Sequence, residues 1–122
     1  MTPTIYGYAR LLPGTDAASE LARVRRKLGG FAGGRGFMLM DVFALERPGQ
    51  RLAVWRELLA HCELFGVRDI VVPSLAHLHD SESLARWMCS DVASFIGGRV
   101  WVVGESAPVG GDLTQGFEVM AA

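Results

Sequence analysis

The sequence predicts a single α/β domain of three layers, in which helices cover both faces of a mainly parallel sheet of four or five strands. Three observations support this prediction. The chain has 122 residues, about the size of one domain, and half of them are apolar. Segments typical of strands alternate with segments typical of helices, an order that favours right-handed crossovers. The run at residues 70–72 is purely apolar, as in a parallel strand covered on both faces.

The first half of the chain predicts a strand, a helix and a second strand. Residues 4–9 contain β-branched and aromatic side chains that favour a strand. Thr15 or Asp16 can cap the helix that follows, in which apolar residues recur at helical spacing. The glycine-rich run 29–36 is predicted to end this helix and to connect it to a strand at 37–44.

The second half predicts two more helix–strand units. A second helix fits residues 48–63, where proline is acceptable in the first turn, and a third helix fits residues 80–95. Strands are predicted at 67–75, in the centre of the sheet, and at 99–103. The side chains predicted to face the core are Leu52, Trp55, Leu59 and Cys62 in the second helix, and Leu84, Trp87, Met88, Val92 and Phe95 in the third.

We expect one domain over residues 1–122, with a core at about 4–103 and a turn-rich tail at 104–122 that holds a short helix at 113–121.

No stretch approaches the roughly 18 apolar residues that span a bilayer, and the amino terminus lacks the pattern of a signal peptide. The two cysteines form no CxxC pair. These features predict a protein of the reducing cytoplasm that has no membrane partner.

The charge balance gives no general indication of nucleic-acid binding. Twelve basic and 13 acidic residues give a formal net charge of −1, whereas nucleic-acid-binding domains usually carry a basic excess. Arg23, Arg26 and Lys27 nevertheless lie together on the polar side of the first helix. Such a cluster is usually a solvated helix face, and a contact with nucleic acid is the alternative.

Polar side chains follow three of the predicted strands. In an open α/β sheet, ligands bind beyond the carboxyl ends of the strands, and Arg10, Arg47, His77 and Asp80 all fall in those loops. Two guanidinium groups near a histidine can bind a phosphate or a carboxylate. The alternative is that the arginines pair with neighbouring acidic residues and only hold the loops together.

The sequence contains no convincing metal-binding or cofactor-binding motif. His77 and His79 alternate like metal ligands and Asp80 could add a carboxylate, but a zinc site usually needs three protein ligands and the chain is short of them. The run 29–36 leads from a helix into a strand, the reverse of a phosphate-binding loop. We therefore predict no metal and no cofactor.

Three segments resemble motifs of the serine recombinases, the resolvase and invertase group. Residues 5–10, IYGYAR, look like the opening strand of that family's catalytic domain. Residues 46–48, ERP, are similar to its second arginine motif, and residues 75–80, LAHLHD, occupy the place of its Leu-Asp-Arg-Leu-Gly-Arg segment. The resemblance implies a resolvase-like fold with Arg10 and Arg47 as matching site residues.

The departures from this pattern concern the chemistry of the family. The resemblance places Leu12 where the family has its nucleophilic serine, and a leucine cannot attack a phosphodiester. Ala76, His77, His79 and Asp80 replace an acidic residue, two arginines and a glycine. The family's long dimerisation helix and its DNA-binding domain would follow beyond residue 122. These differences predict that the chain is not an enzyme.

Three functions follow as hypotheses. The first is a catalytically inactive, resolvase-like binding or regulatory module that acts through protein contacts, as a homodimer or larger oligomer. The second is a small anion- or nucleotide-binding protein or enzyme that reuses the strand-end crevice, with Arg10 and Arg47 for the anion and His77, His79 and Asp80 for proton transfer or a metal. The third is weak nucleic-acid binding, without sequence specificity, through Arg23, Arg26 and Lys27.

Overall fold

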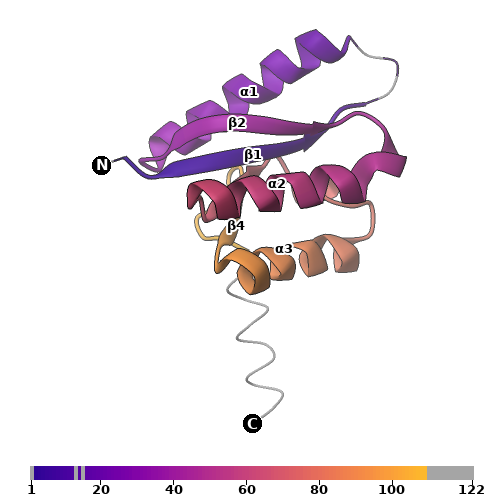
Figure 1. Cartoon of the computed structure of the whole chain (residues 1–122). Coiled ribbons are helices and arrows are strands. Elements are labelled where there is room, and N and C mark those ends of the chain that lie inside the picture. Colours follow the sequence, from indigo (N-terminus) through magenta and orange to yellow (C-terminus); the bar gives the residue numbers. More distant parts are fainter. Residues whose placement is uncertain (1, 13, 15, 110–122) are drawn as a thin grey trace.

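The computed structural model describes residues 2–12, 14 and 16–109. Within them, a four-stranded parallel sheet lies between one helix on one face and two helices on the other (Figure 1). This architecture confirms the predicted fold class. The elements in chain order are β1 (Thr4–Arg10), α1 (Ala17–Gly34), β2 (Met38–Leu45), the 3₁₀ turn η1 (Pro48–Gln50), α2 (Arg51–Phe65), β3 (Asp69–Val72), the 3₁₀ turn η2 (Leu75–His77), α3 (Glu82–Ile96) and β4 (Arg99–Val102).

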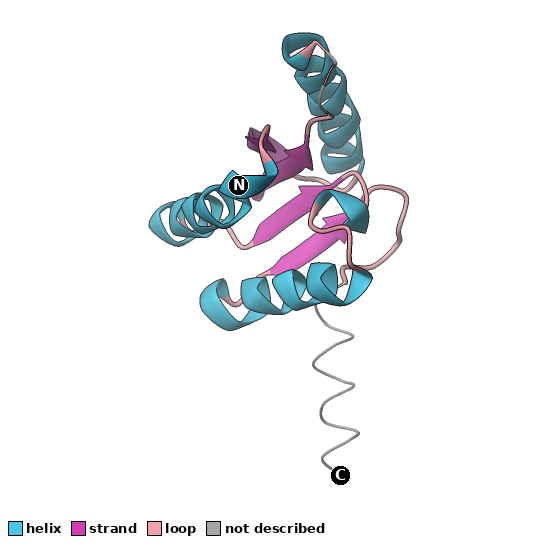
Figure 2. Cartoon of the chain, turned by 90° about the vertical axis from the view of Figure 1, so that its right-hand side faces the viewer, coloured by secondary structure: helices cyan, strands magenta, loops and turns pink. Residues whose placement is uncertain are grey.

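The strand order is β2-β1-β3-β4, so β1 and β3 are central. Alternation along β1 divides the core into two parts. Ile5 and Ala9 pack toward α1, together with Leu28, whereas Tyr6 and Tyr8 pack toward α2 and α3. Figure 2 shows the sheet between these two helical layers. All four residues of β3 are buried, which accounts for their continuous apolar run after Asp69.

The first helix ends inside the glycine-rich run 29–36, as predicted, but most of the run is helical and does not form a connection. α1 continues through Gly34, and the chain turns away from the helix at its C-cap Arg35 and at Gly36, whose φ is +80°. Tertiary contacts explain the extension, because Ala32 is fully buried and the Phe31 ring lies 6.5 Å from that of Trp101. Packing of this turn against β4 outweighs the low helix propensity of glycine.

The predicted inner faces of α2 and α3 are only partly right. Trp55, Cys62, Met88 and Val92 are buried as expected, but the core side also takes residues that the sequence analysis did not choose, namely Leu58, Ala85 and Cys89. Four residues predicted to be buried are instead exposed: Leu52, Leu84, Trp87 and Phe95. Both helices carry more apolar residues than one face can bury, so the spacing alone does not fix which stripe meets the sheet.

The chain ends α2 and α3 in the same way. Gly66 and Gly97 follow these helices with φ values of +67° and +62°, a left-handed conformation that glycine adopts without a Cβ clash. The short helix predicted at 113–121 lies outside the described residues. No helix in the described part of the chain combines the length and the apolar character that a membrane span requires.

Candidate anion-binding site

The loops after β1, β2 and β3 lie at one end of the sheet, where the carboxyl ends of the parallel strands meet; this end is called the carboxyl edge below. β1 ends at Arg10, and the Leu11 N–H continues the pairing by donating to the Leu45 carbonyl at 2.9 Å. The chain after β3 turns through η2 directly beside the end of β1. The parallel topology therefore brings together side chains that are about 70 positions apart in the sequence.

Arg10, at the end of β1, contacts the chain that follows β3 through both its backbone and its side chain. Its backbone N–H donates to Nδ1 of His77 at 3.0 Å, and its guanidinium Nη1 forms a close ion pair with Oδ1 of Asp80. The structure thus places three of the four site residues chosen from the sequence, Arg10, His77 and Asp80, in one cluster. Asp80 is the most exposed of them and faces solvent.

The electrostatics of this cluster are dominated by positive charge. Burial lowers the pKa of His77 below its ordinary value of 6.5, and the charges of Arg10, Lys27 and Arg23 lower it further, whereas Glu20 acts in the opposite direction. His77 is therefore neutral at pH 7, and because Nδ1 accepts a hydrogen bond, the ring proton is on Nε2. The hydrogen bond and charge of Arg10 likewise lower the pKa of Asp80, so this carboxylate stays ionised.

Arg47 is not part of the cluster. It precedes η1 as an exposed residue, and in the part of the chain that the structure describes its side chain makes no hydrogen bond or ion pair. Arg51, at the start of α2, is instead the second arginine that acts on this cluster. Its charge lowers the pKa of both Asp80 and Tyr8. The helical spacing of α2 could have suggested Arg51, which follows Arg47 by one turn.

Two buried polar atoms accompany Arg51. Among the described residues, neither its Nε nor the hydroxyl of Tyr8 has a hydrogen bond of good geometry. The two side chains nevertheless lie close together, since a hydrogen bond from Arg51 is one of the causes that lower the pKa of Tyr8. Burial raises the pKa of Tyr8, so its hydroxyl is protonated at neutral pH and can donate.

The basic face of α1 is divided. Arg23 and Lys27, one helical turn apart, act electrostatically on His77 and so extend the positive surface of the crevice. Arg25 instead pairs with Asp41 on β2 at 3.2 Å. Arg26 is exposed and acts on neither His77 nor Asp80. Of the three basic residues chosen from the sequence, Arg23 and Lys27 thus act on the cluster around His77.

Leu12 lines a hollow at the start of α1. Its side chain is 55% exposed, and its backbone N–H points to the Glu20 carboxylate at 3.3–3.4 Å. The hollow has a volume of about 290 Å³, and Ser19 and Arg23 also line it. The Ser19 hydroxyl donates to Asp16 at 2.9 Å, as part of the cap of α1.

The two histidines of the HxH pair do not point to one centre. His77 Nδ1 accepts from Arg10, whereas His79 Nδ1 accepts from the backbone N–H of Ser81 at 3.0 Å. Across residues 2–12, 14 and 16–109, no three histidine, cysteine or acidic side chains cluster closely enough to hold a metal ion. The donor set at this edge instead suits an anion, because it consists of guanidinium, ammonium and hydroxyl groups.

Comparison with known proteins gives matches in structure alone. No protein-family model matches the sequence, and a search of curated proteins found no match. The catalytic domain of TP901-1 integrase is 17% identical and has a TM-score of 0.68, with 97% of this chain and 93% of that chain covered. The chain has the fold of a serine recombinase catalytic domain.

Two further structures support this fold. The C-terminal catalytic domain of ISC1926 TnpA, an IS607-like serine recombinase, is 18% identical with a TM-score of 0.62, covering 97% of this chain and 82% of that one. A resolvase family site-specific recombinase from Streptococcus pneumoniae is 13% identical with a TM-score of 0.66, covering 98% of this chain and 88% of that one. The resemblance stated from the three sequence motifs is thereby confirmed.

The same comparison corrects one prediction. From Leu12 and the altered third motif we expected that the chain is not an enzyme. The serine recombinase structures that it matches include two catalytic domains, and no described residue gives a positive sign against catalysis.

Proposed function

We propose that this resolvase-like domain binds the phosphodiester backbone of nucleic acid, without sequence specificity, at the carboxyl edge of its sheet. The observation that carries the proposal is the ion pair between Arg10 and Asp80. It supports the proposal because the Arg10 guanidinium already contacts an anionic oxygen whose carboxylate is exposed to solvent. A phosphate oxygen can take the place of that carboxylate.

The surroundings favour a phosphate chain over a small carboxylate. Arg10 and Arg51 act on Asp80, and Arg10, Arg23 and Lys27 act on His77, so basic side chains from β1, α1 and α2 surround one short loop. An extended run of basic groups matches successive phosphates better than it matches one small acid. The formal net charge of −1 is compatible with this arrangement, because four of the 12 basic residues, Arg10, Arg23, Lys27 and Arg51, act on the same short loop.

The test is titration of a short fluorescent DNA duplex with the full chain, followed by anisotropy at several salt concentrations. We expect salt-sensitive binding, and we expect Arg10→Ala to weaken it about tenfold, as for loss of a hydrogen bond between charged groups, and to reduce the salt slope by about one. Lys27→Ala, at an exposed position that the core does not need, should weaken binding in the same direction.

Arg68→Ala is the matched control. Arg68 is exposed just before β3, at the opposite edge of the sheet, and its loss changes the net charge by the same amount. Affinity that is insensitive to salt, or an equal effect of Arg10→Ala and Arg68→Ala, would contradict the proposal. Circular dichroism of each variant shows that the fold is retained.

Function through protein contacts is the second candidate. Its support is a separate feature, an apolar groove between α2 and α3 that leaves two large aromatic side chains exposed. A regulatory role for such contacts and a cytoplasmic location remain predictions from the sequence.

A further inference from the structure

A hollow with a volume of about 310 Å³ opens between the start of α2 and the middle of α3. This volume is at the lower end of the range for pockets that hold small molecules, about 300–1,000 Å³. The buried side chains of Trp55 and Met88 form its apolar floor. Its other lining residues include Trp87 and Asp91 from α3 and Arg51 from α2. The hollow therefore combines a flat aromatic ring with one acidic and one basic group.

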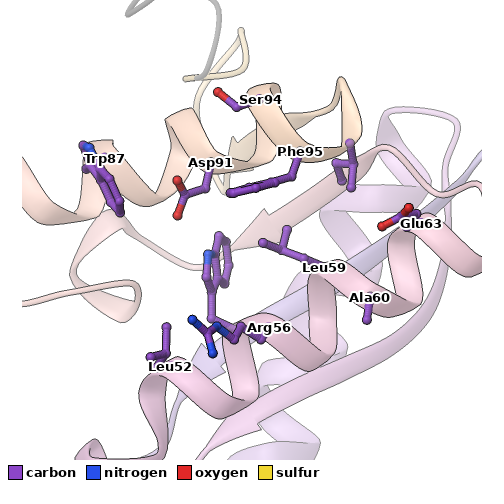
Figure 3. Close-up of a pocket in the computed structure, with 11 residues that line it drawn as sticks. Leu52, Arg56, Leu59, Ala60, Glu63, Trp87, Asp91, Ser94 and Phe95 are labelled. Atoms are coloured by element: carbon purple, nitrogen blue, oxygen red, sulfur yellow. The ribbon is translucent and has the colours of Figure 1, made fainter.

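Trp87 and Asp91 lie side by side on one face of α3. They are four positions apart, which is about one helical turn, and Figure 3 shows both side chains directed from α3 toward α2. Trp87 is 65% exposed, so much of its indole ring is accessible for stacking by a flat aromatic ligand. A ligand stacked on this ring presents its edge to the Asp91 carboxylate.

The Asp91 carboxylate has no cationic partner in the described part of the chain. It forms no ion pair there, and burial raises its pKa. The indole N–H of Trp55 lies close to it, since a hydrogen bond from Trp55 is the cause that acts on this pKa in the opposite direction. Trp55 is 3% exposed and holds the carboxylate from the floor of the hollow. N–H donors of a ligand would stabilise a carboxylate that is partly desolvated in this way.

Arg51 supplies positive charge at the other wall of the hollow. Its Nε makes no hydrogen bond of good geometry among the described residues, where its guanidinium also forms no ion pair. Its charge acts on Asp80, so the same side chain lies between the hollow and the cluster around Arg10. A guanidinium group without a carboxylate partner is suited to a phosphate.

We infer that the hollow binds a guanine nucleotide: the base stacks on Trp87, its N1–H and N2–H groups donate to Asp91, and its 5′-phosphate pairs with Arg51. Guanine fits because its edge presents two neighbouring N–H donors to the two oxygens of a carboxylate. Adenine and cytosine present one amino group beside a ring nitrogen that accepts, and a carboxylate repels that nitrogen. The inference goes beyond the proposed binding of the phosphodiester backbone and does not depend on it.

Isothermal titration calorimetry of the full chain with guanosine monophosphate (GMP), adenosine monophosphate (AMP) and guanosine tests the inference. We expect GMP to bind about tenfold more tightly than AMP, the discrimination that one paired base edge gives. Guanosine should bind more weakly than GMP, and Arg51→Gln should remove this difference. Trp87→Ala should weaken GMP binding about tenfold through the loss of stacking. Phe95→Ala is the matched control, since Phe95 is an exposed aromatic residue of the same helix that does not line the hollow.

Asp91→Asn provides a readout that a purely structural role of Asp91 would not produce. The asparagine amide donates where a carboxylate oxygen accepted, so it matches xanthine, which has an oxygen in place of the guanine amino group. We expect GMP binding to weaken about tenfold or more and xanthosine monophosphate (XMP) binding to improve. The same variant should bind duplex DNA as the unchanged protein does, because guanine edges are paired in a duplex. The base site and the phosphodiester site can therefore fail independently.

A strand of thymidines that carries one guanine separates the two sources of the nucleotide. Binding of GMP assigns the hollow to a free nucleotide, and binding of the guanine-bearing strand alone assigns it to single-stranded nucleic acid. Equal affinities for GMP and AMP overturn the inference, as does the absence of binding by both GMP and the guanine-bearing strand. An Asp91→Asn variant that still prefers GMP to XMP overturns it as well.

Discussion

At the scale of single residues, the crevice holds an anion that the chain itself supplies. Asp80 is exposed to solvent, yet its carboxylate contacts Arg10, the residue with which we propose that a phosphate pairs. An ion pair between exposed groups is weak, so a phosphate that brings several contacts can displace it. Asp80 is thus a competitor for external anions, and it should reduce the affinity of the crevice for them.

Replacing Asp80 tests this competition. Asp80→Asn keeps the shape of the side chain and removes its charge, so we expect DNA affinity to rise by about two- to fivefold, the range for loss of an exposed ion pair. Anisotropy with the same duplex measures the change. Glu57→Gln, an exposed acid on α2, removes the same charge and should alter affinity less. A decrease in affinity with Asp80→Asn would contradict competition.

A second residue-scale prediction concerns Gly98, which precedes β4. A Cβ at this position would lie 2.0 Å from the Arg68 carbonyl oxygen, and backbone atoms cannot yield easily there because Arg99 N–H donates to that same oxygen at 2.8 Å. Gly98→Ala should therefore destabilise the domain by on the order of 3 kcal/mol or more. Urea unfolding followed by circular dichroism measures the loss.

Gly30→Ala is the control for that experiment. Gly30 is exposed within α1, and a Cβ there meets nothing within 4 Å. The substitution should stabilise the domain by about 0.5–1 kcal/mol, since alanine favours a helix more than glycine does. Equal stabilities of the two variants would show that the close approach at Gly98 is not maintained in solution.

At the scale of elements, the ends of the helices follow from local chemistry and their buried faces do not. Asp16 caps α1, accepting from the Ala18 N–H at 3.1 Å and from the Ser19 hydroxyl at 2.9 Å. These hydrogen bonds lower the pKa of Asp16 below its ordinary 3.8. When the pKa of a carboxyl group is lower in the folded than in the unfolded protein, the group stabilises the fold at every pH above its pKa in the unfolded chain.

This cap predicts part of the acid sensitivity of the domain. The contribution of Asp16 to the free energy of unfolding should be fully present above about pH 4. It should be lost as the pH falls through the lowered pKa that Asp16 has in the folded protein. Asp16→Asn keeps a capping oxygen that does not titrate, so its stability relative to the unchanged protein should improve as the pH falls from 7 to 3. Urea unfolding at each pH measures this. A difference that does not change with pH would contradict it.

At the scale of the molecule, the sheet separates two apolar clusters, and both cysteines belong to the one under α2 and α3. Cys62 and Cys89 are buried free thiols. Burial raises the pKa of Cys62 to about 12, with a further contribution from the charge of Asp69, and burial raises that of Cys89 to about 11. Thiols in this state are packing groups in the core and not nucleophiles.

Thiol reactivity therefore reports on the intact core. At pH 8 we expect both cysteines to react with an aromatic disulfide reagent only as fast as the domain unfolds, and to react at once in concentrated urea. Leu64→Cys, with its thiol at an exposed position of α2, should react immediately in the folded protein. Rapid reaction of the unchanged protein in buffer would show that α2 and α3 do not cover the core stably.

The sequence by itself determined the order of strands and helices and the parallel sheet, because strand and helix periodicities and the cap at Asp16 are local properties. The resemblance of three short motifs, and not periodicity, indicated the serine recombinase fold. Tertiary structure alone decided three other matters: that α1 continues through its glycines, that Trp87 and Phe95 face solvent, and that Arg51 and not Arg47 joins Arg10. The reason in each case is physical. Helical spacing defines several possible apolar stripes, and only docking on the sheet selects the stripe that is buried and the basic residues that reach its edge.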